Sequence, residues 1–141
     1  MSEVFVLSRV VRFGECDPAG VVYYPVFFNW FHELMEAWFE TSLGISYAQC
    51  IQKVGFPAKE TNAVFFRPVA LGESVDLHMH LSQLSPRSFR MDIEVKSQEK
   101  TKAKGYVVCV CIGVSPDGFQ FAPQEIPQDL YTKMQKYVSS T

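Results

Sequence analysis

The chain has 141 residues, of which 48% are hydrophobic and 20% charged, and these proportions predict one globular domain spanning residues 1–141. Its formal net charge is -2 at pH 7, and its lysine and arginine residues are scattered along the sequence. Nucleic-acid binding usually requires a basic patch or stripe, so we do not expect this class of function.

The N-terminal residues Met1–Leu7 lack a basic leader region, and Arg9 and Arg12 interrupt the apolar run before it could span a membrane. We therefore expect a cytoplasmic protein without membrane insertion. Cysteines stand at positions 16, 50, 109 and 111, with no Cys-x-x-Cys spacing and no zinc-type histidine pair nearby. This scatter favours free thiols in a reducing compartment.

The first predicted element is a strand over Phe5–Phe13, where β-branched and aromatic residues alternate imperfectly with polar ones. The segment from Gly14 to about Tyr24 contains two glycines and a proline, which are typical of a connecting loop.

The longest helical pattern runs from Pro25 to about Leu43, with a proline suited to a first helical turn and Gly44 after its end. Its polar residues form one narrow stripe, made of Asn29, His32, Glu33, Glu36 and Glu40. The other positions are almost all apolar, so the helix must be enclosed on several sides. A curved sheet wrapped around it would achieve this.

A short helix is predicted around Tyr47–Val54, and strand-like segments then follow in close succession. They are Asn62–Leu71, Ser74–Leu84, Ser88–Lys96 and Ala103–Val114. The short turns between them favour antiparallel neighbours. Ser115–Gly118 is expected to end the sheet, and Gln128–Val138 to form a modest surface helix.

This order of elements predicts an α+β fold, in which a five-stranded antiparallel sheet wraps around a long central helix in the order β-α-β-β-β-β. One sheet edge would remain exposed in such a domain. Proteins usually cover or pair such an edge, so we expect a homodimer or homotetramer with a continuous sheet.

The segment Gly14–Pro25 reads Gly-Glu-Cys-Asp-Pro-Ala-Gly-Val-Val-Tyr-Tyr-Pro and is followed by the aromatic helix. It resembles the 4-hydroxybenzoyl-CoA thioesterase family of hotdog-fold proteins, including the 1,4-dihydroxy-2-naphthoyl-CoA and Tol-Pal-associated thioesterases. The order of elements agrees over nearly the whole chain. The resemblance implies a hotdog fold and hydrolysis of an acyl-CoA thioester with an aromatic or medium-sized acyl group. It implies no cofactor, because coenzyme A is part of the substrate.

The resemblance also implies that Asp17 acts as nucleophile or general base, and that the backbone amide of Tyr24 polarises the thioester carbonyl. Elementary chemistry supports both roles, since unpaired N–H groups at a helix start suit an oxyanion. The glycine-containing loop can fold the Asp17 carboxylate back toward that helix start. An alternative for Asp17 is a loop carboxylate that caps the following turn, because Asp-Pro is common turn chemistry.

Contacts to coenzyme A are implied at the turn before Phe89, where Arg87 and Ser88 fit the basic-Ser-Phe pattern of the family. The phosphates of the nucleotide would attract Arg87 and Arg90 through charge-assisted hydrogen bonds. His32 could orient the substrate or the catalytic water, or belong to a polar stripe at a dimer interface.

His78 and His80 lie two residues apart on one strand face, but no third ligand is near, so we expect exposed strand residues and no metal site. Lys102 and Lys104 are expected at a solvated edge, with a secondary contact to a coenzyme A phosphate as the alternative.

Two other functions use the same fold. One is hydrolysis of acyl groups carried by acyl carrier protein, and the other is a non-catalytic hotdog protein that binds an acyl ligand or a partner protein. An intact Asp17 argues against the second alternative.

Overall fold

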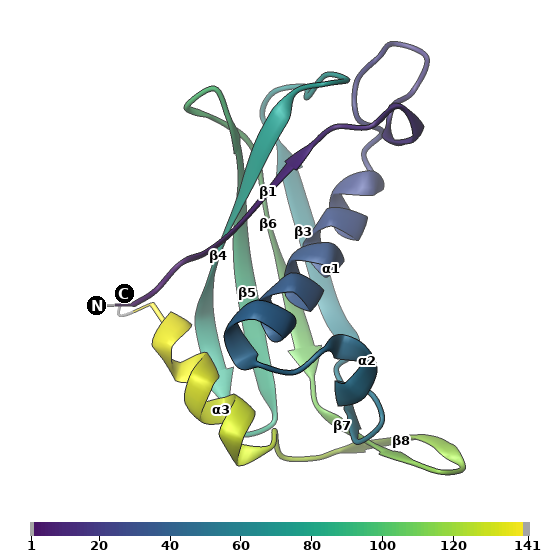
Figure 1. The fold of residues 1–141 in the computed structure, drawn as a ribbon, viewed down its shortest axis with the longest axis vertical. Coiled ribbons are helices and arrows are strands. Elements are labelled where there is room, and N and C mark those ends of the chain that lie inside the picture. The colour runs from purple at the N-terminus through teal and green to yellow at the C-terminus, as the bar shows by residue number, and fades with distance from the viewer. Residues whose placement is uncertain (1, 140–141) are drawn as a thin grey trace.

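The computed structural model describes residues 2–139, apart from the side chains of residues 119–121. Its main sheet has five antiparallel strands in the order β1-β4-β5-β6-β3. Their bounds are β1 Phe5–Val10, β3 Ala58–Phe65, β4 Ser74–Ser85, β5 Ser88–Ser97 and β6 Lys100–Val110. Helix α1 (Val26–Trp38) lies along one face of this sheet (Figure 1). This arrangement confirms the predicted hotdog fold.

The core forms between α1 and the inner face of the sheet. Alternate residues of β4 and β5 are buried, and the register pairs Leu77 with Val95 and Met79 with Ile93. The helix contributes six buried side chains, which are Phe27, Trp30, Phe31, Leu34, Met35 and Trp38. The period of two in the strands and the broad apolar face of the helix therefore produce a single core.

The predicted long helix is divided into two parts. After Trp38 the chain continues as a π-helical turn over Phe39–Leu43, and it ends at Gly44 with a φ of 74°. A helix C-terminus of this kind favours glycine because a side chain would be strained in the left-handed conformation. The following short helix α2 covers Tyr47–Cys50, which is shorter than the predicted segment.

A second, three-stranded sheet was not predicted. It consists of β2 (Val54–Gly55), β7 (Ile112–Ser115) and β8 (Gly118–Pro123) in the order β2-β7-β8. The predicted strand Ala103–Val114 breaks at Cys111, whose amide donates to the Arg87 carbonyl over 2.8 Å. Ser115–Gly118 is therefore a hairpin turn within this small sheet, not the end of all sheet structure.

Strand β3 begins and ends earlier than the predicted strand Asn62–Leu71. It ends at Phe65 because the amides of Phe66 and Arg67 both donate to the Lys102 carbonyl, at 2.8 and 3.1 Å, which breaks the ladder. Pro68 then follows and has no amide to donate. The residues after it contact the loop that contains Asp17 instead of extending the strand.

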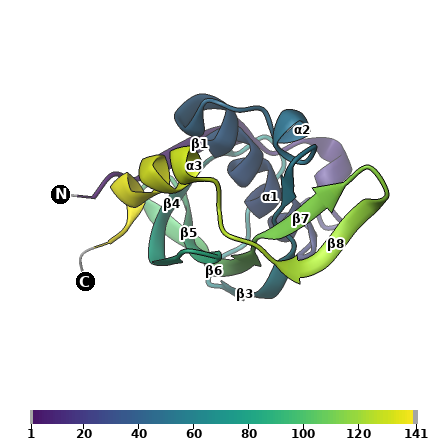
Figure 2. The same cartoon turned by 90° about the horizontal axis from the view of Figure 1, so that it is seen from below.

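The C-terminal segment forms helix α3 (Gln128–Met134) and a 3-10 turn over Gln135–Tyr137. The expected surface helix is in fact part of the core, because Leu130, Met134 and Tyr137 are buried. Figure 2 shows α3 beside β4 on the same side of the sheet as α1. Within residues 2–139, no helix is both long enough and apolar enough to cross a bilayer.

Lys102 does not lie at a solvated edge as predicted. Its residue is only 8% exposed, and its Nζ lies 3.2 Å from a carboxylate oxygen of Glu73 and donates to the Pro68 carbonyl over 3.3 Å. Burial of the lysine stem with a paired ammonium group ties β6 to the loop over residues 66–73. Sequence alternation alone could not reveal this partner, which lies 29 residues earlier.

Candidate active site

The segment between β1 and α1 folds into a narrow hairpin with Asp17 near its tip. The Tyr23 amide donates to the Glu15 carbonyl over 3.0 Å, and the Asp17 amide donates to the Val21 carbonyl over 2.9 Å. The turn is closed by the Gly20 amide, which donates to the Asp17 carbonyl over 2.9 Å. Gly20 has a φ of 79°, a conformation that glycine adopts without steric cost. The backbone of Asp17 is therefore held in place.

The Asp17 side chain is half-buried and uses one oxygen within the turn. Its Oδ1 accepts a hydrogen bond from the Ala19 amide at 2.8 Å. No hydrogen bond from residues 2–139 reaches its Oδ2. The turn-capping interpretation and the catalytic interpretation are thus compatible, because the capping bond orients the carboxylate and leaves one oxygen available.

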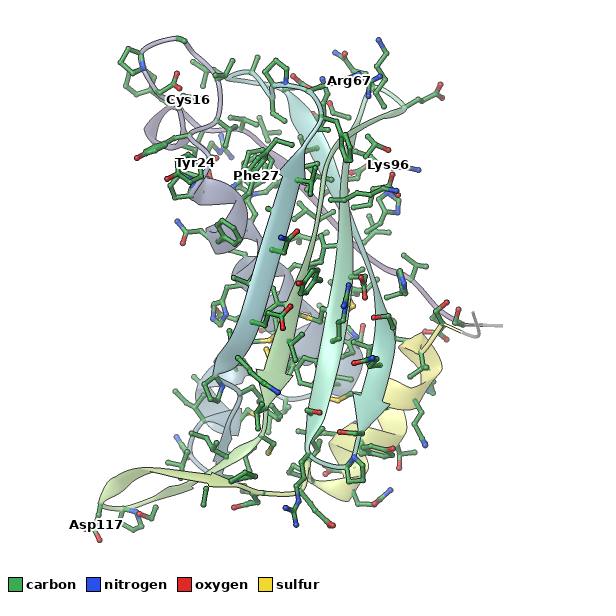
Figure 3. All side chains as sticks on the ribbon, turned by 180° about the vertical axis from the view of Figure 1, so that it is seen from behind. Cys16, Tyr24, Phe27, Arg67, Lys96 and Asp117 are labelled. Carbon is green, nitrogen blue, oxygen red and sulfur yellow. The ribbon has the colours of Figure 1, made fainter. Side chains whose placement is uncertain are left out.

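Tyr24 lies at the start of α1, and its amide has no acceptor within residues 2–139. The next amides are already used, since Val26 donates to the Tyr23 carbonyl at 2.9 Å and Phe27 to the Tyr24 carbonyl at 3.2 Å. Pro25 has no N–H. The Tyr24 amide is therefore an available donor at the positive end of a helix, as an oxyanion site requires. Figure 3 shows Cys16, the neighbour of Asp17, at the same end of the molecule as Tyr24.

Glu15 fixes this hairpin to the rest of the fold, a role that the sequence did not indicate. Its Oε1 accepts from an Arg9 guanidinium nitrogen at 2.8 Å and from the Arg12 amide at 2.9 Å. Its Oε2 accepts from Trp30 Nε1 at 2.8 Å and lies 2.8 Å from the second terminal nitrogen of Arg9. The Arg9 guanidinium also stacks on the Trp30 ring at 4.7 Å from its centroid. We call Arg9, Glu15 and Trp30 the Glu15 cluster.

The Glu15 cluster keeps the Glu15 carboxylate ionised. Burial alone would raise the pKa of Glu15, but the hydrogen bonds from Arg9, Trp30 and the Arg12 amide, with the Arg9 charge, outweigh it and lower the pKa. Glu15 thus stays ionised while both its oxygens are occupied. The sequence could suggest the Arg9–Glu15 pair, since these residues are six positions apart. It could not suggest the bond to Trp30, which lies fifteen residues after Glu15.

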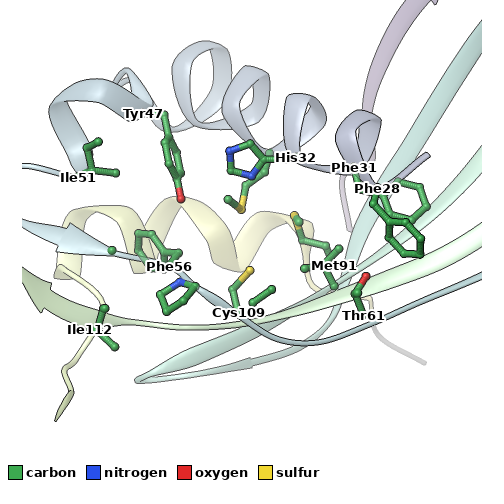
Figure 4. Close-up of a pocket in the computed structure, with 15 residues that line it drawn as sticks. Phe28, Phe31, His32, Tyr47, Ile51, Phe56, Thr61, Met91, Cys109 and Ile112 are labelled. Carbon is green, nitrogen blue, oxygen red and sulfur yellow. The ribbon is translucent and has the colours of Figure 1, made fainter. Parts of the chain in front are cut away.

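A cavity of about 580 Å³ lies between α1, α2 and the main sheet. Its helical wall and its floor are mostly apolar, and include Phe28, Phe31, Met35, Met91, Val107 and Cys109. Figure 4 shows these helix side chains facing the strand residues across the cavity. Burial raises the pKa of the Cys109 thiol to about 12, so this group stays a neutral part of the wall.

His32 lines this cavity, so the structure places this predicted residue on the candidate acyl-binding side of α1. Its Nε2 lies 3.1 Å from a carboxylate oxygen of Glu36, and both side chains are about half exposed, at 51% and 50%. The ring of Tyr47 packs edge-on against His32, with centroids 5.3 Å apart. The Tyr47 hydroxyl points into the cavity (Figure 4). Burial and, to a lesser degree, nearby Cys109, Cys50 and Glu36 raise the pKa of Tyr47 to about 12.

Arg87 and Ser88 lie at the other end of the sheet from Asp17. Strand β4 begins beside the end of β1, where Ser74 pairs with Val10, and it ends at the turn that carries Arg87. Its twelve residues span roughly 36 Å at about 3.3 Å per residue. Arg87 is exposed, whereas the Ser88 hydroxyl lies 2.7 Å from that of Ser85. A single chain therefore does not bring these residues to Asp17.

Arg90 is already engaged within the chain. Its guanidinium lies 3.8 Å from the centroid of the Tyr106 ring and donates to Asp92 over 3.2 Å. These contacts place the side chain on the outer face of the sheet, because the neighbouring Phe89 is buried on the inner face. The outer face also carries His78 and His80, which alternate with buried residues of β4. Within residues 2–139, no three His, Cys, Asp or Glu side chains form a group that could hold a metal ion.

Comparisons with known proteins identify the family of the chain. A family model described as the thioesterase-like superfamily matches residues 11–134. A 1,4-dihydroxy-2-naphthoyl-CoA hydrolase of Nostoc punctiforme is 31% identical over 129 residues, covering 91% of this chain and 87% of that relative. The structure of a 1,4-dihydroxy-2-naphthoyl-CoA thioesterase from Synechocystis has a TM-score of 0.82 at 26% identity, covering 94% of this chain and 96% of its own. A gentisyl-coenzyme A thioesterase gives a TM-score of 0.81 at 27% identity, with 92% and 99% covered.

Proposed function

The chain belongs to the thioesterase-like superfamily, and from this membership we propose that it hydrolyses the thioester bond of an acyl-CoA. The observation that carries the proposal is the pairing of an available carboxylate oxygen on Asp17 with an available amide at Tyr24 in one hydrogen-bonded loop. Relatives named as hydrolases of aromatic acyl-CoA thioesters support this reaction class.

In this mechanism the thioester carbonyl oxygen accepts a hydrogen bond from the Tyr24 amide. The amide and the positive end of α1 then stabilise the negative charge that develops on this oxygen as the carbonyl carbon is attacked. The attacking group is the Asp17 carboxylate or a water molecule that Asp17 deprotonates. When water attacks, Asp17 takes a proton from it, the C–S bond breaks, and the leaving thiolate of coenzyme A takes up that proton. When Asp17 attacks, the C–S bond breaks and an anhydride between the acyl group and Asp17 forms. Water then hydrolyses this anhydride to the free acid and the Asp17 carboxylate, and the thiolate takes up the proton that the water releases.

This reaction requires no cofactor, because a thiolate is a good leaving group and water is the only co-substrate. The enzyme is proposed to act in the cytoplasm, where its cysteine thiols remain reduced. Cys50, Cys109 and Cys111 are buried and Cys16 is half-buried, all without a disulfide.

The active enzyme is proposed to be a homodimer or homotetramer that pairs through β3. This strand pairs with β6 on one side only, and seven of its eight residues are exposed. Exposed aromatic side chains stand at its end, including Tyr24, Phe65 and Phe66. An exposed strand edge beside apolar side chains is a site for pairing with a second copy.

Antiparallel pairing of two β3 strands also addresses the separation of Arg87 from Asp17. The two-fold axis would reverse the partner chain, so the β4–β5 turn of the partner would lie at the end that carries Asp17 here. In this arrangement Arg87 of one copy, with Ser88 beside it, serves the nucleotide phosphates of a substrate bound at the other copy's Asp17. Arg90 could join only by leaving Tyr106 and Asp92.

The decisive experiment measures thiol release from a panel of acyl-CoA thioesters by the wild type and by Asp17→Asn. Loss of general-base or nucleophilic function is expected to lower kcat by at least about 100-fold. KM should change little, because Asp17 does not contact the nucleotide. Full activity of Asp17→Asn would refute the mechanism, whereas a wild type inactive on every thioester would refute the function.

A further inference from the structure

The apolar cavity beside α1 indicates a substrate class more specific than acyl-CoA. We propose that this cavity binds a linear, apolar acyl chain of about ten to twelve carbons, and that Ile51 at its far end limits the chain length. This inference rests on the proposed thioesterase function. It differs from the hydroxylated aromatic acyl groups in the names of the relatives.

One end of the cavity faces the proposed oxyanion site along two elements. On α1, Phe28 lines the cavity and lies four residues, or about one helical turn, after Tyr24. On β3, Thr61 lines the cavity and lies four residues, roughly 13 Å, before Phe65, whose ring centroid is 6.4 Å from that of Tyr24. An acyl group whose carbonyl meets the Tyr24 amide therefore enters the cavity between α1 and β3.

The residues that line the cavity extend along both of these elements. On α1 they run from Phe28 to Met35, roughly 10 Å at about 1.5 Å per residue, and on β3 from Ala58 to Thr61, also roughly 10 Å. From Tyr24, one helical turn before Phe28, to Met35 the chain advances roughly 16 Å. An extended alkyl chain advances roughly 1.3 Å per bond, because its bonds of about 1.5 Å alternate in direction, so about twelve carbons cover this distance. A single aromatic ring would cover only the near part of it.

The near part of the cavity is mainly apolar, because Phe28 and Phe31 form its helical wall. The Thr61 hydroxyl donates to the Tyr106 carbonyl over 2.9 Å, and His32 is paired with Glu36 at the rim. Methylene groups of a linear acyl chain gain from burial against this apolar wall.

The far end of the cavity is formed by Tyr47, Ile51 and Phe56 (Figure 4). Ile51 follows α2 and is 38% exposed, so a larger side chain at this position would extend over the cavity without replacing core atoms. Gln52 is the adjacent exposed residue and does not line the cavity. This pair of neighbours provides a test variant and a matched control.

The first measurement is kcat/KM of the wild-type enzyme for straight-chain acyl-CoA thioesters from butyryl to palmitoyl, beside gentisyl- and dihydroxynaphthoyl-CoA. Each added methylene is expected to raise kcat/KM about fourfold, from roughly 0.8 kcal/mol per buried methylene. The rise should stop near twelve carbons. A profile that does not depend on chain length, or a preference for the hydroxylated aromatic thioesters, would overturn the inference while leaving the thioesterase function intact.

The second measurement compares Ile51→Trp with Gln52→Trp on the same panel. Ile51→Trp should shift the optimum to shorter chains by about three carbons, so its kcat/KM should fall much more for dodecanoyl-CoA than for butyryl-CoA. Gln52→Trp should behave like the wild type. Ile51→Ala, which removes side-chain atoms and needs no repacking, should shift the optimum to longer chains. Equal profiles for all three variants would contradict the assignment of Ile51. No activity of the wild type on any thioester would instead refute the proposed function, and full activity of Asp17→Asn would refute the proposed mechanism.

Discussion

Replacing Glu15 with glutamine tests whether the Glu15 cluster holds the hairpin that carries Asp17 in place. The substitution keeps the size of the side chain but removes its charge and turns one acceptor oxygen into a donor. That amide group would face either Arg9 or the Trp30 indole N–H, each of which now donates at 2.8 Å. Two donors would then oppose each other in a site where the Glu15 side chain is only 17% exposed.

The size of the effect follows from the bonds that are lost. A hydrogen bond to a charged group contributes about 1.5 to 3 kcal/mol, and removing one partner of a buried ion pair costs about 3 to 5 kcal/mol. Arg9 keeps its stacking on Trp30 and its contact with Glu33 at 3.4 Å, so the lower end applies. We expect Glu15→Gln to lower the free energy of unfolding by about 3 kcal/mol and Tm by roughly 10 °C.

The loss should depend on pH with a defined sign. The pKa of Glu15 lies below its ordinary value of 4.5 in the folded chain, so the cluster stabilises the fold fully above the unfolded pKa. This contribution disappears as the pH falls through the folded pKa. The difference in unfolding free energy between wild type and Glu15→Gln should therefore be constant from pH 6 to 8 and shrink below about pH 4.5.

The assay is urea unfolding at several pH values together with kcat at a temperature where every variant is folded. Glu73→Gln is the matched control, because Glu73 is 13% exposed, pairs with Lys102 and also has a lowered pKa. Both variants should lose stability, but Glu15→Gln should lower kcat more, since Glu15 lies in the hairpin of Asp17 whereas Glu73 acts on it only through the loop over residues 66–73. A loss of stability below about 0.5 kcal/mol, or equal kcat losses in both variants, would refute this reasoning.

Three further predictions concern other parts of the molecule. Arg87→Glu should raise KM for acyl-CoA at least tenfold but leave carrier-protein thioesters less affected; the reverse would favour the acyl carrier protein alternative. Leu34→Ala, at 0% exposure beneath the sheet, should lower the unfolding free energy by about 2 to 5 kcal/mol in denaturant titrations. Iodoacetamide at pH 8 should modify half-buried Cys16 in the native chain. Burial raises the pKa of Cys109 to about 12, so this thiol should react only after unfolding, which mass spectrometry would show.

The sequence was sufficient for the order of the five main strands and α1 and for the Asp17 motif, because these are encoded locally. Side chains face the same side every two residues on a strand and about every 3.6 residues on a helix. This period correctly predicted the burial of Leu77, Met79 and the apolar face of α1. Asp17 and Tyr24 are seven residues apart, and one loop with Gly20 joins them. Local patterns therefore predicted the fold class and both proposed catalytic groups.

Boundaries and edges were less predictable, since partners outside each segment decide them. The chain leaves the main sheet at Cys111 because its amide bonds to Arg87, and α3 is buried because Leu130 and Met134 reach the core. The sequence predicts Lys102 as a surface residue, whereas in the fold its ammonium group pairs with Glu73. Each of these outcomes depends on contacts between residues far apart in the chain.

The sequence by itself thus determined the hotdog order of elements and the positions of the candidate nucleophile and oxyanion donor. Only the tertiary structure decided that Glu15 joins Arg9 to Trp30, that Arg87 lies at the opposite end of the sheet from Asp17, and that an apolar cavity lies between α1, α2 and the main sheet. The physical reason is that periodicity fixes which face a side chain occupies. Strand register and packing fix which distant residue it meets.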